Sequence, residues 1–143
     1  MMADNKLVID ASVAIKWYVP ELGSQEAAAV LDREEFLIAP DLLAAEFGNV
    51  LWKKVRKGEL AQAEATEIIA VFTSSGSIAL RPVSVYLSAA FDLAIRWNLT
   101  VYDALYLAVA IEESCPLVTA DETLGRGLRG TALENSVLVL GRA

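Results

Sequence analysis

The sequence predicts an α/β protein with three layers, in which helices cover both faces of a central, mainly parallel sheet. Short runs of β-favouring apolar residues alternate with helical stretches along the chain, and this alternation is typical of a parallel sheet. Residues 7–9 and 36–39 are apolar at every position, as expected of strands that are buried on both faces. At 143 residues the chain has the length of one domain, which we expect to span residues 1–143.

The expected elements follow from apolar periodicity and from the residues that bound them. Ser24 and Asp41 are candidate N-caps, Pro40 ends the second strand, and Gly58 closes the helix that follows it. Residues 125–130 contain three glycines and are expected to be flexible. The expected helices lie at residues 13–18, 24–31, 42–57, 62–72, 84–97 and 103–113. The expected strands lie at residues 7–9, 36–39, 78–80, 117–120 and 137–140.

Composition excludes several classes of function. Twelve Lys and Arg against 19 Asp and Glu give a net charge of −7, which argues against a protein that coats nucleic acid through a basic surface. The chain has no histidine, so Ser-His-Asp triads and His-based zinc sites are ruled out. Its one cysteine, Cys115, rules out an internal disulfide.

Hydrophobicity bears on location and assembly. The longest unbroken apolar run, residues 104–111, is far shorter than the roughly 20 residues of a membrane helix. The N-terminus is short and polar and lacks the apolar region of a secretory signal, so we expect a cytoplasmic protein. Hydrophobic residues make up 55% of the chain, and aromatic residues such as Trp52 and Tyr86 are expected at the surface. We therefore expect a homodimer.

Two carboxylates follow apolar strands directly. Asp10 ends the first strand and Asp121 follows the fourth, and each has a hydroxyl residue two positions away, Ser12 and Thr119 respectively. In an open α/β sheet, ligands bind at the carboxyl ends of the strands. Both acids also have a simpler explanation, because Asp is a common N-cap of the helix or turn that comes next.

Two further carboxylates are expected near the same edge of the sheet. Glu46 lies one helical turn from Leu42 and from Val50, inside the apolar stripe of its helix, so it needs a base, a backbone donor or a metal as partner. A salt bridge is the ordinary alternative. Asp103 begins a helix that is almost wholly apolar and therefore central, although with Thr100 it also resembles a capping box.

Four acids of this kind, in a chain without histidine, point to a hard divalent ion. Carboxylate oxygens suit Mg²⁺ or Mn²⁺. Two such ions about 4 Å apart are suited to in-line attack of water on a phosphodiester. The sequence therefore predicts metal-dependent hydrolysis of a phosphodiester.

The same motifs resemble those of the PIN domain family and, more narrowly, the VapC-type toxins of bacterial and archaeal toxin–antitoxin pairs. The resemblance rests on VIDAS at residues 8–12, Glu46, YDALYLA at residues 102–108 and TAD at residues 119–121. It spans about residues 7–140. It implies a PIN-like α/β/α fold, a metal-dependent endoribonuclease that acts on RNA, a VapB-type antitoxin as partner, and a homodimer.

Residue roles follow from the chemistry and the resemblance together. Asp10, Asp103 and Asp121 would be the principal metal ligands, directly or through water, and Glu46 would orient the attacking water or bind a second ion. The hydroxyls of Ser12 and Thr119 would hold carboxylates in place. The basic residues that would contact RNA phosphates, or equally form an ordinary charged surface, are Lys53, Lys54, Arg126 and Arg129.

Three other functions are consistent with part of this pattern. A phosphoacceptor receiver domain also gathers acids around Mg²⁺ at this edge, but receivers resemble one another in an adjacent acid pair after the first strand, whereas Asp10 stands between Ile9 and Ala11. A phosphatase of the haloacid-dehalogenase type would have a second acid where Ser12 stands. A non-catalytic binding module with a PIN fold stays open.

Overall fold

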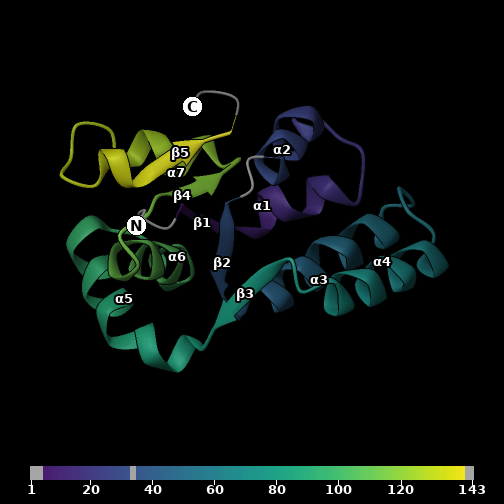
Figure 1. Cartoon of the computed structure of the whole chain (residues 1–143), viewed down its shortest axis with the longest axis horizontal. Helices are drawn as coiled ribbons and strands as arrows, with labels where there is room; N and C mark the ends of the chain where they lie inside the picture. The colour runs from purple at the N-terminus through teal and green to yellow at the C-terminus, as the bar shows by residue number, and fades with distance from the viewer. Residues whose placement is uncertain (1–4, 33–34, 141–143) are drawn as a thin grey trace.

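The computed structural model describes residues 5–32 and 35–140 (Figure 1), so most of the short polar N-terminus lies outside the described residues. Its sheet has the order β3-β2-β1-β4-β5, and all neighbouring strands are parallel. The predicted parallel sheet is therefore confirmed, and each strand ends within one residue of its expected bounds. The strands are β1 (Lys6–Ile9), β2 (Phe36–Pro40), β3 (Ile78–Arg81), β4 (Leu117–Thr119) and β5 (Val137–Val139).

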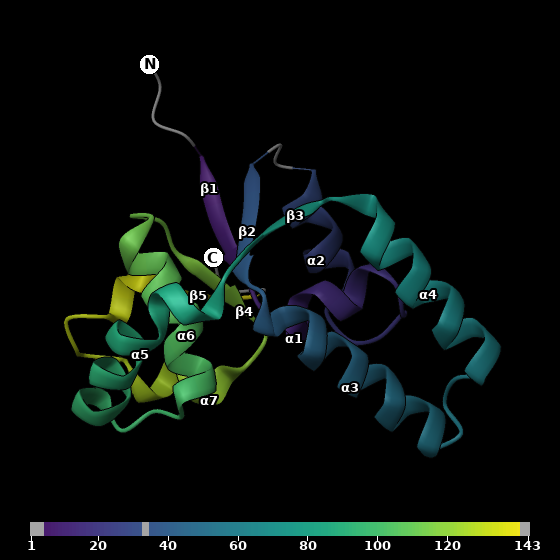
Figure 2. The same cartoon turned by 90° about the horizontal axis from the view of Figure 1, so that it is seen from below.

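Helices cover both faces of this sheet, as predicted (Figures 1 and 2). On one face α6 lies against β1, β2 and β4, and α5 packs on the outer side of α6. On the other face α1 contacts β4 and α3 contacts β2, with α4 packed beside α3. The helices are α1 (Ala11–Ala14), α2 (Ser24–Leu31), α3 (Leu42–Arg56), α4 (Gln62–Ser75), α5 (Val83–Trp97), α6 (Val101–Glu112) and α7 (Glu122–Gly127), with 3₁₀ turns η1 (Ile15–Trp17) and η2 (Glu134–Ser136).

The core is centred on β1 and α6. Residues 104–110 of α6 are all buried, which confirms that this nearly uniform apolar helix is central. On the other face three rings join η1 to α3 and α4: Phe47 and Phe72 stack with centroids 4.1 Å apart, and Tyr18 meets Phe47 edge to face at 5.4 Å. These contacts hold α3, which carries Glu46, against α4 and against the residue that follows η1.

One of the two predicted N-cap positions is confirmed. Asp41 occupies the N-cap position of α3, as predicted, but its side chain makes no capping hydrogen bond there. Its carboxylate instead accepts a hydrogen bond from the backbone N–H of Val83 (3.0 Å), at the start of α5. Gly23, with a φ of 88°, precedes α2 in place of Ser24. The Ser24 hydroxyl accepts instead from the backbone N–H of Glu21 (2.9 Å). The donor to Ser24 is brought within reach by a local turn, whereas the pairing of Pro40 with Arg81 brings Val83 to Asp41.

The glycine-rich segment at residues 125–130 is partly helical, because α7 continues to Gly127. The prediction of a flexible stretch is therefore wrong for residues 125–127. A Cβ at Gly125 would overlap Cγ2 of Val139, so the small residue lets α7 approach β5 closely.

The aromatic residues expected at the surface have different environments. Trp52 is 54% exposed, as predicted, whereas Tyr86 is buried, which corrects that prediction. Tyr86 shares the inner face of α5 with Ala90 and Ala94, whereas Leu87 and Phe91, at positions between them, are exposed. Within residues 5–32 and 35–140, no helix is long and apolar enough to cross a membrane.

Candidate active site

The four predicted acids lie around one pocket, at the point where the strand order reverses. Strands β2 and β3 extend from one side of β1, and β4 and β5 extend from the other. Ile9 pairs with Val118, so the residues that follow β1 and β4 are adjacent at the carboxyl edge. A pocket of about 530 Å³ opens there, which we call the acidic pocket. The polar and aromatic side chains in its lining are Asp10, Ser12, Glu46, Asn49, Lys53, Tyr102, Asp103, Tyr106 and Asp121.

Asp10 is held by three donors, two from α1 and one from β4. The Ser12 hydroxyl donates to its Oδ1 (2.5 Å), the Thr119 hydroxyl donates to its Oδ2 (2.5 Å), and the backbone N–H of Val13 donates to Oδ1 (3.3 Å). Burial raises the pKa of Asp10 to about 6, although these hydrogen bonds oppose the rise. Asp10 therefore caps α1, as the simpler explanation predicted, and also lies in the pocket.

The two hydroxyl groups connect Asp10 to the loop that carries Asp121. Ser12 Oγ accepts from the backbone N–H of Ala120 (2.9 Å), and Thr119 Oγ1 accepts from the backbone N–H of Asp121 (3.0 Å). Each hydroxyl gives its only proton to Asp10, so the direction of both hydrogen bonds is set. A carboxylate oxygen has two lone pairs. Oδ1 of Asp10 accepts both the Ser12 hydroxyl and the Val13 N–H, whereas Oδ2 accepts only the Thr119 hydroxyl and can still bind a further partner.

Asp121 and Asp103 each lie at the start of a helix. Oδ1 of Asp121 caps α7 by accepting from the backbone N–H groups of Thr123 (2.9 Å) and Leu124 (3.3 Å). At the start of α6 the Thr100 hydroxyl accepts from the backbone N–H of Asp103 (3.1 Å). Burial, followed by the negative charge of Asp121, raises the pKa of Asp103.

Glu46 is half-buried and has a hydroxyl partner that the sequence analysis missed. The Tyr106 hydroxyl, from α6, donates to Glu46 Oε1 at 2.6 Å. Burial raises the pKa of Glu46, the Tyr106 hydrogen bond lowers it, and the charge of Asp103 raises it further. A salt bridge was the ordinary alternative for Glu46, and within the described residues Glu46 forms none. Burial and the Glu46 carboxylate raise the pKa of Tyr106, so this hydroxyl stays protonated and donates.

Helical spacing was the signal that could have identified Tyr106. It follows Asp103 by three residues, so both side chains lie on the same face of α6. That face was expected to point at the carboxyl edge of the sheet, and Glu46 was expected to need a donor. A tyrosine hydroxyl is a suitable donor for a carboxylate that is partly withdrawn from water.

The four basic candidates are placed very differently. Lys53 lines the acidic pocket. Lys54 faces another way, because its ammonium pairs with Glu21 at 2.9 Å and with Glu59 at 3.7 Å. Arg126 and Arg129 are exposed on and just after α7, outside the lining of the pocket.

The donor chemistry of the pocket fits a hard divalent ion. Its candidate ligands are carboxylate oxygens, and the pKa values of Glu46 and Asp103 are raised by burial and by neighbouring negative charge, which a cation would relieve. Among the residues that the structure describes, no three acidic side chains stand close enough together to hold one ion as they are placed. The four acids thus share a pocket without forming a closed set of ligands.

Sequence comparison identifies the family of the chain that carries this pocket. The profile of the PIN domain family matches residues 7–127, which carry all four acids. The chain belongs to the PIN domain family. Among relatives of this PIN domain, ribonuclease VapC3 of Pyrobaculum aerophilum is 36% identical over 120 residues, covering 83% of the chain and 92% of the relative. Exonuclease VapC9 of the same organism is 31% identical over 109 residues, covering 76% and 80%.

Structural comparison supports the same fold. A chain in the toxin–antitoxin complex from Klebsiella pneumoniae matches this PIN domain with a TM-score of 0.63, covering 96% of the present chain and 99% of that chain. The sequence identity is 14%, so this likeness bears on the fold alone. Membership of the PIN family removes the receiver and haloacid-dehalogenase alternatives.

Proposed function

We propose that this chain is a divalent-metal-dependent endoribonuclease and the toxin of a VapBC-type toxin–antitoxin pair, built as one PIN domain and located in the cytoplasm with its RNA substrate. The observation that carries the proposal is the gathering of four carboxylates and two ordered hydroxyls around one pocket at the carboxyl edge of the sheet. The name of the relative VapC3, a ribonuclease, supports it.

In this proposal Asp10, Asp103 and Asp121 hold Mg²⁺ or Mn²⁺, directly or through water. A divalent ion of this kind lowers the pKa of bound water and stabilises negative charge on a phosphodiester. The Ser12 and Thr119 hydroxyls keep Asp10 turned toward the pocket. Their hydrogen bonds go to the two different oxygens of the carboxylate and so restrict its rotation.

Glu46 orients the attacking water or binds a second ion. Its Oε1 already accepts the Tyr106 hydrogen bond, which restricts the rotation of the carboxylate and directs its remaining lone pairs. Its raised pKa suits a group that accepts a proton from water. Lys53, on the same helix, is placed to contact a phosphate of the bound RNA.

The test is cleavage of RNA labelled at either end, with Mg²⁺, with Mn²⁺ and with EDTA. We expect internal fragments from both labels when metal is present, and intact RNA in EDTA. Asp121→Asn should abolish cleavage, whereas Asp92→Asn, which removes an exposed acid on α5, should not. Equal cleavage in EDTA would rule out the metal mechanism. Stepwise shortening from one end would favour exonuclease activity, the activity named for the relative VapC9.

The proposed protein partner is a VapB-type antitoxin that places a basic side chain among the four acids. Burial, and then neighbouring negative charge, raise the pKa of Glu46 and Asp103, and a cation there would offset both effects. Inhibition should weaken as salt rises, because salt screens charges at the pocket mouth. An antitoxin segment without a basic residue that inhibits equally well in high salt would contradict this mode of inhibition.

The proposed assembly is a homodimer formed through the outer face of α5. Four apolar side chains there are between 49% and 71% exposed: Val85, Leu87, Phe91 and Ile95. Stable dimers often bury about 2,000 Å² or more, and a second copy would cover such a face. Light scattering should show a dimer at micromolar concentration and a monomer for Ile95→Lys. A monomeric wild type would contradict the dimer.

A further inference from the structure

A second, mostly apolar pocket borders β3 on the face of the sheet that carries η1, α3 and α4, and we call it the edge pocket. Its volume of about 180 Å³ is below the roughly 300–1,000 Å³ of most small-molecule sites and suits a single large side chain. The described residues that line it carry no charge, and none of them lines the acidic pocket. Its larger apolar side chains are Trp17, Tyr18, Phe72, Ile78 and Leu80.

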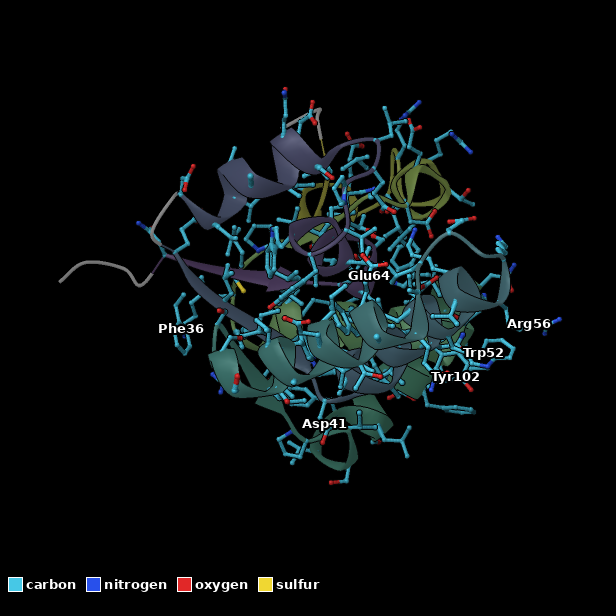
Figure 3. The ribbon with its side chains drawn as sticks, turned by 90° about the vertical axis from the view of Figure 1, so that its right-hand side faces the viewer. Phe36, Asp41, Trp52, Arg56, Glu64 and Tyr102 are labelled. Carbon is cyan, nitrogen blue, oxygen red and sulfur yellow. The ribbon has the colours of Figure 1, made fainter. Side chains whose placement is uncertain are left out.

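The strand beside this pocket, β3, is the outermost strand at one edge of the sheet (Figure 1). Figure 3 shows Phe36, at the start of β2, at the opposite end of the molecule from Tyr102, which lines the acidic pocket. Leu37 pairs with Ile78, so β3 begins at the same end as Phe36. Leu80 is 42% exposed, whereas the residues of β5, at the other edge, are buried or half-buried. The edge at β3 therefore exposes a large apolar side chain, which the edge at β5 does not.

The backbone of β3 has polar groups that point out of the sheet. The N–H of Asp41 donates to the carbonyl of Arg81 at 2.7 Å, so Arg81 turns its backbone toward β2. Backbone direction alternates along a strand, so Ala79 also faces β2, whereas Ile78 and Leu80 turn their N–H and C=O groups outward. Within residues 5–32 and 35–140, these outward groups have no hydrogen-bond partner. They form a template on which another strand can pair.

This edge lacks most of the features that protect the edge strands of natural proteins. Such strands commonly carry an exposed Lys, a Pro or a bulge. The charged residue of β3 is Arg81, and its guanidinium pairs with Glu113 at the end of α6 (3.3 Å). That ion pair draws the Arg81 side chain to the face of the sheet opposite the edge pocket, because neighbouring side chains of a strand point to opposite faces. The four residues of β3 limit pairing to a short segment.

An added strand would satisfy the backbone groups and fill the pocket at once. Extended peptides bind sheet edges through main-chain hydrogen bonds, and pockets for alternate side chains give specificity. Ile78 and Leu80 point to the same face and both line the edge pocket, so every second side chain of a strand paired with β3 would face that pocket. A second copy of this chain fits less well, because it would present its own Ile78 and Leu80, which already line its own edge pocket.

We propose that β3 is a docking edge for an extended segment of another protein. The segment pairs as a sixth strand with the outward backbone groups of Ile78 and Leu80, and it inserts one bulky apolar side chain into the edge pocket. Its recognition depends on main-chain hydrogen bonds and an apolar side chain rather than on charge. The inference goes beyond the proposed ribonuclease function and does not depend on it, because no residue of the acidic pocket takes part.

The probe is a phage-displayed library of random seven-residue peptides, selected on the immobilised wild-type chain. We expect the selected peptides to be rich in β-favouring residues and to share a bulky apolar residue. Fluorescence anisotropy of the synthetic peptides then measures affinity. Leu80→Lys places a charge at the edge, and Ala44→Leu adds bulk to an exposed residue of the pocket lining. Each should weaken binding about tenfold or more, the scale of one buried apolar side chain.

Matched controls make the same changes elsewhere. Leu31→Lys, on α2, alters a leucine that is also 42% exposed, and Ala63→Leu adds the same bulk to an exposed position of α4. Neither residue lines the edge pocket, so both variants should bind the peptides as wild type does. A selection that yields no peptide sensitive to both Leu80→Lys and Ala44→Leu would overturn the inference.

Strand addition also predicts a change in the backbone itself. Amide hydrogen exchange of Ile78 and Leu80, followed by NMR, should slow about tenfold or more when peptide binds, whereas exchange of Ala79, which already faces β2, should change little. If the peptides bind and exchange of Leu80 is unchanged, they occupy the pocket without pairing and the inference is wrong. If light scattering shows that Leu80→Lys alters the assembly of the chain, the edge is a subunit interface and the inference is equally wrong.

Discussion

Asp10 shows that one residue can cap a helix and also be a candidate metal ligand. Its Oδ1 accepts from the backbone of α1, and both of its oxygens accept hydroxyl protons from Ser12 and Thr119. The Thr119 side chain is fully buried and in turn accepts from the Asp121 backbone. Such a buried network is expected to hold the carboxylate in one orientation, because each unpaired polar group would be costly.

Tyr106 offers the sharpest test of a single residue. Tyr106→Phe removes the hydroxyl that donates a hydrogen bond to Glu46, but it keeps the ring that packs in the core. Loss of one hydrogen bond to a charged group costs about 1.5–3 kcal/mol at most. We expect kcat to fall about tenfold or more with KM little changed, because Glu46 is then free to rotate.

A general loss of stability in Tyr106→Phe can be separated from the loss of Glu46 positioning. A Mg²⁺ titration of the melting temperature should show a weaker stabilisation of Tyr106→Phe than of wild type. Tyr86→Phe is the control, since Tyr86 is a buried tyrosine on α5 outside the pocket. A lower melting temperature with unchanged kcat and unchanged Mg²⁺ response would mean that Tyr106 serves only the fold.

At the scale of elements, Glu113 ties the end of α6 to the sheet. Its carboxylate pairs with Lys6 of β1 at 3.0 Å and with Arg81 of β3 at 3.3 Å. The hydrogen bond from Lys6, and then that from Arg81, hold the pKa of Glu113 below its ordinary value. A carboxylate whose pKa is lower in the folded state stabilises the fold above its unfolded pKa and loses that effect as pH falls through its folded pKa.

Glu113→Gln should therefore destabilise the protein at pH 7 by about 1 kcal/mol, the scale of an accessible ion pair. The difference in melting temperature between variant and wild type should be about 2–4 °C at pH 7. It should shrink as the pH falls below the unfolded-state value of about 4.3. Thermal melts from pH 7 to pH 3 measure it, and a difference that is constant over this range would show that the ion pairs do not stabilise α6.

The contact between α7 and β5 gives a second prediction at this scale. Gly125→Ala should destabilise the protein by about 1–3 kcal/mol, because the new methyl group would overlap Val139. The double variant Gly125→Ala, Val139→Ala should recover part of that loss relative to the sum of the single changes. If the two changes in unfolding free energy are simply additive in denaturant melts, the destabilisation by Gly125→Ala does not come from contact with Val139 and arises elsewhere in α7.

For the whole molecule, the four acids of the proposed metal site are expected to lower the stability of the metal-free protein. In the absence of metal they repel one another in a partly buried pocket. Burial, and then the charge of a neighbouring acid, raise the pKa of Asp103 and Glu46. Asp103→Asn removes one charge and keeps the backbone N–H that donates to the Thr100 hydroxyl at the start of α6. An Asn side chain can also keep a hydrogen bond with Thr100, the contact that lowers the pKa of Asp103. The variant should melt higher than wild type in EDTA, since the repulsion is reduced.

The same comparison with Mg²⁺ tests the site. Mg²⁺ should raise the wild-type melting temperature, because a ligand that binds only the native state stabilises it by mass action. Asp103→Asn should lose that response together with RNA cleavage, and Asp92→Asn, on the outer side of α5, should behave as wild type. If Asp103→Asn melts lower in EDTA and still responds to Mg²⁺ as wild type does, the acids are structural and the proposed site is wrong.

The sequence by itself determined the parallel α/β architecture, the bounds of its strands, the central position of α6 and the family. Each of these depends on patterns within a few residues: apolar runs, helical periodicity and short motifs. The placement of Asp10 and Asp121 at one edge followed as well, because in a parallel sheet all carboxyl ends meet there.

Only the tertiary structure decided which side chains meet. Glu46 and Tyr106 are 60 residues apart, and their contact depends on how α3 and α6 pack on opposite sides of the sheet edge. Lys53 and Lys54 are adjacent in sequence, yet a turn of about 100° per residue directs one into the pocket and the other to Glu21. Local propensity determines that these residues are helical, whereas the rotation and contacts of each helix are set by packing against distant parts of the chain.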